Sequence, residues 1–177
     1  VKKAVERTKE IKVGNGLEPN TGMGPLISKG QLENFENHIK DAVNKGAKIL
    51  CGGNRIKSKG YFFEPTVLVD VNNDMKLMAE ETFGPAMPIQ AVENVDEALK
   101  LSNSTNFGLG ASVWSRDTEK AKKIAGKLEA GSVGINKTVG SNSEIPWGGV
   151  KQSGLGRMLS KYGAREFTNI KNVSRNL

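Results

Sequence analysis

A carboxylate and an aromatic ring lie two residues apart in the segment Glu81-Thr82-Phe83-Gly84-Pro85. In an extended backbone, residues i and i+2 point to the same side, so Glu81 and Phe83 can face one ligand together. A carboxylate can accept hydrogen bonds from both hydroxyls of a ribose, and a ring can lie against the sugar and a nicotinamide. The segment on its own admits this dinucleotide site, although a solvated acid and a core phenylalanine would explain the same residues.

A second segment, residues 146–157, has the sequence Pro-Trp-Gly-Gly-Val-Lys-Gln-Ser-Gly-Leu-Gly-Arg, with four glycines in twelve residues. Such a density indicates a backbone that approaches another segment closely. An ordinary surface loop would also explain the glycines, and Ser141, a little upstream in Gly-Ser-Asn-Ser, is readily explained as a turn serine.

The residue pattern does not support a phosphate loop, a histidine metal site, a Ser-His-Asp triad or a cysteine nucleophile within the chain. The glycine spacing of residues 149–154 is that of a phosphate loop, but Leu155 follows where Lys and Ser or Thr are needed. His38 is the single histidine and falls on the side of its helix that we expect to be exposed, so neither a histidine metal cluster nor a Ser-His-Asp triad is predicted. Cys51 ends an apolar run with no histidine nearby, and we interpret it as a structural residue.

The elements that position these residues follow from caps and periodicity. Ser28, Asn94 and Asp117 are predicted N-caps, and Gln31 stands at the capping-box position after Ser28. Strands that alternate with helices of about ten residues imply right-handed crossovers and a mainly parallel sheet, an α/β fold. The expected helices cover residues 1–13, 28–45, 94–101, 117–128 and 157–162. The expected strands cover residues 47–51 (buried), 61–69, 86–92, 110–114 and 131–136. Residues 137–156 are expected to be loop, and 166–173 a terminal extended segment.

Composition bounds the class of protein. The chain has 177 residues, of which 37% are hydrophobic and 25% charged, and this is typical of one soluble globular domain. The net charge of +7 comes from lysines interleaved with acids, so nucleic-acid binding is not expected. We expect neither a membrane span nor a signal peptide, and the single cysteine favours a reducing, cytoplasmic setting.

The two segments, in this order and spacing, resemble the C-terminal part of the catalytic domain of aldehyde dehydrogenases. The resemblance extends from Val1 to about Val173. Within the family, the sequence most resembles members that oxidise succinate semialdehyde. Five further strings carry it, at residues 24–28, 51–53, 63–67, 106–109 and 131–136. The chain departs from the family at Met158, where the family usually has Glu, and the resemblance implies the loss of an ion pair near the active-site mouth.

The resemblance implies an NAD- or NADP-dependent oxidation of a small aldehyde to an acid. In the family, a cysteine thiolate attacks the carbonyl, hydride passes to the nicotinamide, and a glutamate-activated water hydrolyses the thioester. Carried over, Glu81 and Phe83 face the nicotinamide ribose. Trp147 lines the substrate tunnel, and Ser141 helps to hold a distal carboxylate. None of the family's catalytic residues matches a position in this chain, so we expect the chain alone to be inactive.

The resemblance also implies an organisation and partners. Residues 1–165 would be the C-terminal portion of the catalytic domain, and residues 166–177 a tail strand that joins subunits in a homo-oligomer. The chain would be one part of an enzyme whose N-terminal half lies upstream. The alternative is a non-catalytic binding or assembly module that retains the fold, and Met158 is its best support.

Overall fold

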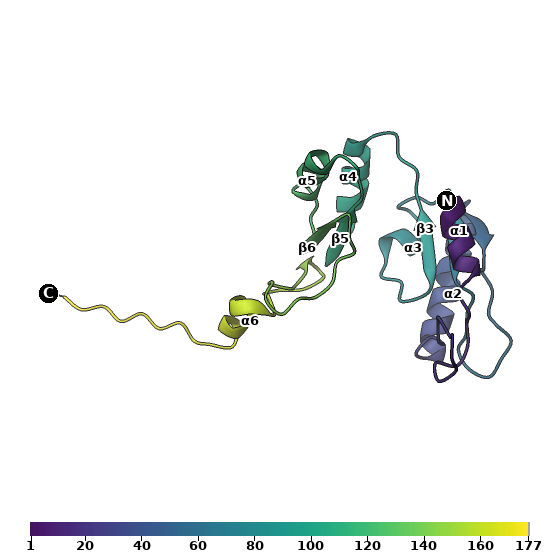
Figure 1. Cartoon of the computed structure of the whole chain (residues 1–177), viewed down its shortest axis with the longest axis horizontal. Coiled ribbons are helices and arrows are strands. Elements are labelled where there is room, and N and C mark those ends of the chain that lie inside the picture. Colours follow the sequence, from purple (N-terminus) through teal and green to yellow (C-terminus); the bar gives the residue numbers. More distant parts are fainter. Residues whose placement is uncertain (177) are drawn as a thin grey trace. The chain divides into compact units, whose positions relative to one another are not determined.

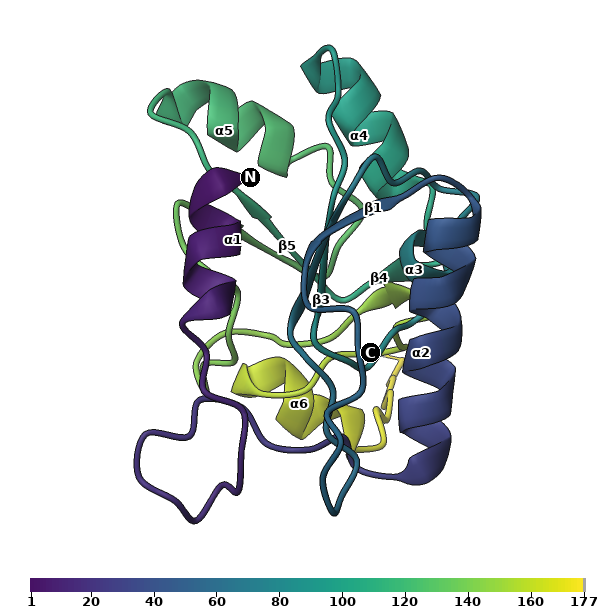
Figure 2. The same cartoon turned by 90° about the vertical axis from the view of Figure 1, so that its right-hand side faces the viewer.

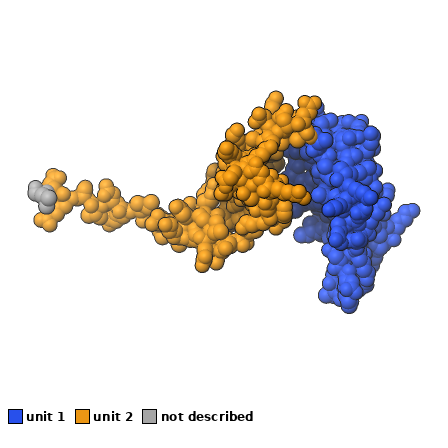
Figure 3. Space-filling view, turned by 45° about the horizontal axis from the view of Figure 1, so that its top comes forward, with its two compact units in different colours: residues 1–91 blue, residues 92–177 orange. Residues whose placement is uncertain are grey.

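The computed structural model describes residues 1–176 of the 177-residue chain. The contacts divide the chain into two compact units, which we call unit 1 (residues 1–91) and unit 2 (residues 92–177), coloured separately in Figure 3. Each unit has its own helices and strands and is described by itself.

Unit 1 is built around a three-stranded sheet in the order β1-β2-β3. The strand β3 and the helices α1, α2 and α3 of this unit are labelled in Figure 1. The strand β1 pairs antiparallel with β2, whereas β2 pairs parallel with β3. The helix α1 contacts β1 and β2, and the strands lie between α1 and α2 in Figure 2. The elements are α1 (Lys2–Lys9), α2 (Lys29–Asn44), β1 (Lys48–Cys51), β2 (Thr66–Val69), α3 (Lys76–Ala79) and β3 (Ala86–Ile89).

The core of unit 1 forms where the apolar face of α2 meets the sheet. Phe35 of α2 is fully buried and its ring meets that of Phe63 edge to face, with the centroids 4.8 Å apart. Leu68 of β2 and Met75 belong to the same cluster. This core fixes α2 beside the segment that connects α3 to β3.

Unit 2 contains one parallel and one antiparallel strand pair. The parallel strands β5 and β6 are joined through α5, which contacts both of them. The short strands β4 and β7 pair antiparallel and bring the glycine-rich segment 146–157 beside residues 107–108. The elements are α4 (Val95–Asn103), β4 (Phe107–Gly108), β5 (Gly110–Val113), α5 (Thr118–Ala125), β6 (Ser132–Ile135), β7 (Val150–Lys151) and α6 (Ser160–Glu166).

The α/β class and the three predicted caps are confirmed, although the strand pairing is more mixed than the sequence indicates. The side chains of Ser28, Asn94 and Asp117 each accept a hydrogen bond from a backbone N–H three residues on. The helix α3 and the strand β7 were not predicted. Among residues 1–176, no helix has the length and apolar character needed to cross a membrane.

Three local expectations are wrong. His38 is only 2% exposed, because its ring is turned to the segment before β3. The strand β1 is not buried: it lies at the edge of its sheet, with Ile49 and Leu50 more than a third exposed. The last helix begins at Ser160, since Leu159 before it has a left-handed φ of +63°. Residues 167–176 form neither helix nor strand, and the expected pairing of this tail with a neighbouring subunit stays a prediction.

Candidate cofactor and substrate sites

The segment of residues 80–85 links α3 to β3 and presents two exposed side chains. Glu81 and Phe83 both point away from the core, and the Phe83 side chain is 69% exposed. Thr82 between them is half-buried, and its hydroxyl lies 2.6 Å from a ring nitrogen of His38. Within residues 1–176, the Glu81 carboxylate has neither a hydrogen bond nor an ion pair. Both side chains named by the sequence are therefore available to a ligand.

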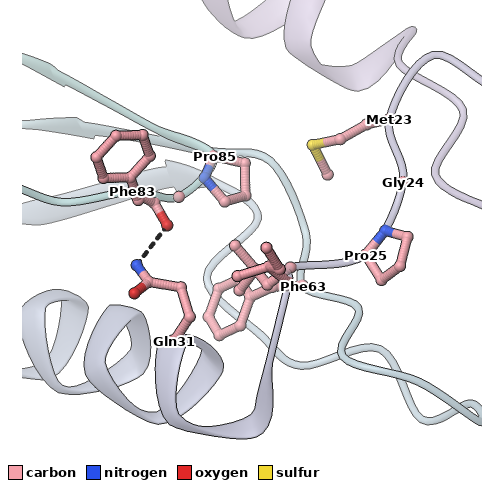
Figure 4. Close-up of a pocket in the computed structure, with 10 residues that line it drawn as sticks. Met23, Gly24, Pro25, Gln31, Phe63, Phe83 and Pro85 are labelled. Atoms are coloured by element: carbon pink, nitrogen blue, oxygen red, sulfur yellow. Dashed lines mark hydrogen bonds between the residues drawn. The ribbon is translucent and has the colours of Figure 1, made fainter.

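The backbone of this segment is fixed by α2. Gln31 does not complete a capping box: its side-chain amide instead donates a 2.6 Å hydrogen bond to the Phe83 carbonyl, as Figure 4 shows. A Cβ on Gly84 would lie 2.1 Å from the Phe35 ring, so only glycine fits at this position. A backbone hydrogen bond from Gly84 N–H to the Thr82 carbonyl turns the chain at Phe83.

A cavity of about 430 Å³ lies beside the Phe83 ring and is lined mainly by apolar groups (Figure 4). Its walls come from residues 23–27, which precede α2, and from Phe63, Phe83 and Pro85. The exposed Phe83 ring and the cavity beside it offer an apolar surface to a ligand. The unpartnered Glu81 carboxylate, two residues away, offers hydrogen-bond acceptors. These residues fit the ribose and nicotinamide of a dinucleotide in size and chemistry.

The start of α3, which leads into this segment, is also held by α2. A carboxylate oxygen of Asp41 accepts a 2.9 Å hydrogen bond from the backbone N–H of Lys76, the first residue of α3. The other oxygen pairs with Lys45 at 2.9 Å. The Lys45 hydrogen bond, followed by that from the Lys76 backbone, holds the pKa of Asp41 below its ordinary value.

In unit 2, Trp147 is positioned by its backbone. It forms an isolated antiparallel bridge with Met158 and is half-buried. The Arg157 guanidinium donates to the carbonyls of Gly149 and Gly156, at 3.0 and 2.6 Å, and closes the glycine-rich segment on itself. The close approach predicted from the glycines is confirmed at Gly131, where a Cβ would lie 1.7 Å from the Gly148 oxygen.

Ser141 lies in the exposed connection between β6 and β7. A cavity of about 400 Å³ is lined by Gly140 and Pro146, the residues directly before Ser141 and Trp147. Two cations, Lys137 and Arg157, line the same cavity. Ser141 and Trp147 themselves are not among the residues that line this cavity, so the structure places them next to it along the chain and does not bring them together around it.

The chain matches the family model described as "Aldehyde dehydrogenase family" over residues 1–173. This chain belongs to the aldehyde dehydrogenase family. It is 46% identical over 93% of its length to the mitochondrial succinate-semialdehyde dehydrogenase of Rattus norvegicus, of which it covers 32%. It is 42% identical over 98% of its length to succinate-semialdehyde dehydrogenase [NADP(+)] 1 of Mycobacterium tuberculosis, of which it covers 38%.

Solved aldehyde dehydrogenase structures give the same result. The succinate-semialdehyde dehydrogenase of Burkholderia pseudomallei matches with a TM-score of 0.89 at 44% identity, over 94% of this chain and 34% of that one. The betaine aldehyde dehydrogenase of Staphylococcus aureus in complex with NAD+ matches with a TM-score of 0.89 at 39% identity, over the same shares of the two chains. The chain thus spans about a third of the length of the relatives it matches.

In this aldehyde dehydrogenase chain, Cys51 lies away from the segment of residues 80–85. It is a half-buried free thiol at the end of β1, and it lines a separate cavity of about 230 Å³ that shares no residue with the one beside Phe83. No group of three or more His, Cys, Asp or Glu side chains within residues 1–176 is placed to hold a metal ion.

Sequence reasoning missed the residues of this aldehyde dehydrogenase chain that hold its segments in place. Lys151 donates from its ammonium to the carbonyls of Asn103 and Thr105, at 2.6 and 2.9 Å, and pairs with Glu129. It thereby ties β7 to the C-terminal end of α4. The four glycines predicted that residues 146–157 form a closely approached loop. No pattern in the sequence indicated which distant carbonyls Lys151 would bind.

Proposed function

We propose that this chain is the C-terminal part of the catalytic domain of an NAD(P)-dependent aldehyde dehydrogenase. The observation that supports this most directly is the exposed, unpartnered Glu81 carboxylate next to the exposed Phe83 ring and its apolar cavity, in a chain of this family. Relatives named succinate-semialdehyde dehydrogenase favour succinate semialdehyde as the aldehyde.

Each proposed site residue has a defined task. Glu81 accepts hydrogen bonds from the ribose hydroxyls, and Phe83 packs against the sugar and the planar ring. Trp147 forms part of the apolar wall against which the aldehyde lies. Ser141 donates a hydrogen bond to the distal carboxylate of the substrate, and Lys137 adds positive charge to the cavity at that connection. The nicotinamide ring, when bound, accepts hydride from the substrate carbon.

The nucleophile comes, in this proposal, from outside these 177 residues. Cys51 is the single cysteine of the chain, and its cavity shares no residue with the one beside Phe83, where the cofactor is proposed to bind. The purified 177-residue chain is therefore expected to produce no NADH or NADPH from succinate semialdehyde, and steady production would contradict this.

The variant Glu81→Gln tests the cofactor assignment in the complete enzyme that carries this chain. A charge-assisted hydrogen bond contributes roughly 1.5–3 kcal/mol, so turnover should fall about tenfold or more. The matched control is Glu6→Gln, which removes another exposed carboxylate of unit 1, in α1. Unchanged cofactor affinity and unchanged turnover in Glu81→Gln would remove the basis for the proposal and favour a non-catalytic module instead.

A further inference from the structure

One face of α2 carries three side chains that contact the segment of residues 80–84. They are Gln31, Phe35 and His38, spaced i, i+4 and i+7, which places them along one stripe of a helix. Gln31 binds the Phe83 carbonyl and Phe35 leaves room only for a glycine at position 84. His38 reaches the two residues on either side of Glu81.

The ring of His38 is held between two oxygen atoms. Its Nδ1 lies 2.6 Å from the Thr82 hydroxyl oxygen, and its Nε2 lies 3.3 Å from a carboxylate oxygen of Glu80. A hydroxyl can both donate and accept, so the Thr82 hydroxyl bonds to Nδ1 in either tautomer of the ring. This hydrogen bond ties the buried ring of His38 to Thr82.

The Thr82 hydroxyl holds the segment of residues 80–84 against α2. Within residues 1–176, Thr82 is the only one of residues 81–85 whose side chain forms a hydrogen bond. Because side chains alternate along the chain, holding Thr82 inward turns Glu81 and Phe83 outward, as their exposure shows. A movement of Thr82 away from α2 would therefore change the direction of the Glu81 and Phe83 side chains together.

We propose that His38 is a positioning residue for the cofactor-binding segment: it holds Thr82 against α2 and so sets the direction of Glu81 and Phe83. The inference rests on the proposed function, since it gives these two side chains their task. His38 itself is 2% exposed and does not line the cavity beside Phe83. It acts through Thr82, and its loss should weaken cofactor binding more than it weakens the fold.

The first test needs no cofactor and uses a matched pair of variants in the 177-residue chain. Thr82→Val removes the hydroxyl, whereas Thr82→Ser keeps it. Hydrogen–deuterium exchange of the backbone amides of Gly84 and Ala86, which bond to Thr82 and Gly84 carbonyls, reports how firmly the segment is held. Loss of the bond should speed their exchange roughly three- to tenfold in Thr82→Val, with little change in Thr82→Ser. Equal exchange in the two variants and the parent would overturn the proposal.

The second test separates positioning from cofactor contact in the complete enzyme. Thr82→Val and His38→Leu, which removes the ring nitrogen that bonds to Thr82, are compared with Glu81→Gln for cofactor dissociation constant, KM and kcat. Thr82→Val and His38→Leu should each raise the cofactor dissociation constant severalfold, whereas Thr82→Ser, which keeps the hydroxyl, should bind the cofactor nearly as the parent does. If Glu81→Gln impairs binding but Thr82→Val binds as the parent does, His38 is not a positioning residue. If Glu81→Gln has no effect, the proposed function fails, and the exchange result alone decides whether His38 fixes the segment.

Discussion

Trp147 and Met158 exchange both of their backbone hydrogen bonds. The Trp147 N–H donates to the Met158 carbonyl at 2.8 Å, and the Met158 N–H donates to the Trp147 carbonyl at 2.7 Å. Residues that face each other in an antiparallel pair direct their side chains to the same side. Met158 is thus the immediate neighbour of the proposed substrate-site aromatic.

The first prediction concerns this pair. Met158→Pro removes the N–H and leaves the carbonyl of half-buried Trp147 unpaired, so it should lower the free energy of unfolding by roughly 1–3 kcal/mol. Met158→Glu keeps the backbone pair, and the side chain is 60% exposed, so its effect should stay within about 0.5 kcal/mol. Urea unfolding of the two variants and the parent measures the difference. Equal stability of the two variants would mean that the backbone pair contributes little.

The second prediction concerns the close contact of Gly84 with Phe35. Gly84→Ala puts a methyl group 2.1 Å from a ring that is fully buried against Phe63, so the ring or the segment must move. Overpacking of this kind costs typically 1–3 kcal/mol. The control is Gly24→Ala in the same unit, where the added methyl meets nothing within 4 Å. We expect a lower midpoint of thermal unfolding for Gly84→Ala and a nearly unchanged one for Gly24→Ala.

The parts of the fold that depend on local chemistry were predictable from the sequence. A polar N-cap acts on a backbone group three residues away, so Ser28, Asn94 and Asp117 could be assigned without knowing the tertiary structure. The helix predicted over residues 28–45 is α2, and its apolar residues Phe35 and Ile39, four apart on one face, are both buried.

The contacts that build the candidate site span long stretches of chain and were not predictable in the same way. The Gln31 side chain could complete a local capping box, but it binds a carbonyl 52 residues away. His38 was expected on an exposed face because its partners, Glu80 and Thr82, come from a segment more than 40 residues downstream. A polar side chain at a helix position that looks exposed is buried when a distant segment brings it matching oxygen atoms.

The third prediction concerns pH and the start of α3. The hydrogen bonds to Lys45 and to the Lys76 backbone lower the pKa of Asp41 from 3.8, so folding favours its ionised form. A carboxyl whose pKa is lower in the folded state stabilises the protein above its unfolded pKa, and this contribution is lost as the pH falls through the folded pKa. The parent should therefore be more stable than Asp41→Ala at neutral pH, with a difference that is constant above about pH 5 and shrinks below about pH 4. Urea unfolding at a series of pH values measures this difference, and a gap that is the same at pH 3 and pH 7 would contradict it.

The last prediction concerns the tail. After α6, residues 167–176 form neither helix nor strand, and Phe167, Ile170 and Val173 are each more than four-fifths exposed. Neither face of the alternating sequence is apolar enough to hold the tail by burial alone, so we expect its backbone groups to pair along a sheet edge of a neighbouring subunit. Deleting residues 169–177 from the complete enzyme should therefore reduce the mass measured by light scattering to that of a smaller assembly. The double variant Ile170→Lys and Val173→Lys should act in the same direction, whereas Asn169→Lys with Asn172→Lys, which adds the same charge at polar positions, should act less. A truncated enzyme that keeps the mass and the thermal stability of its parent would show that the tail takes no part in assembly.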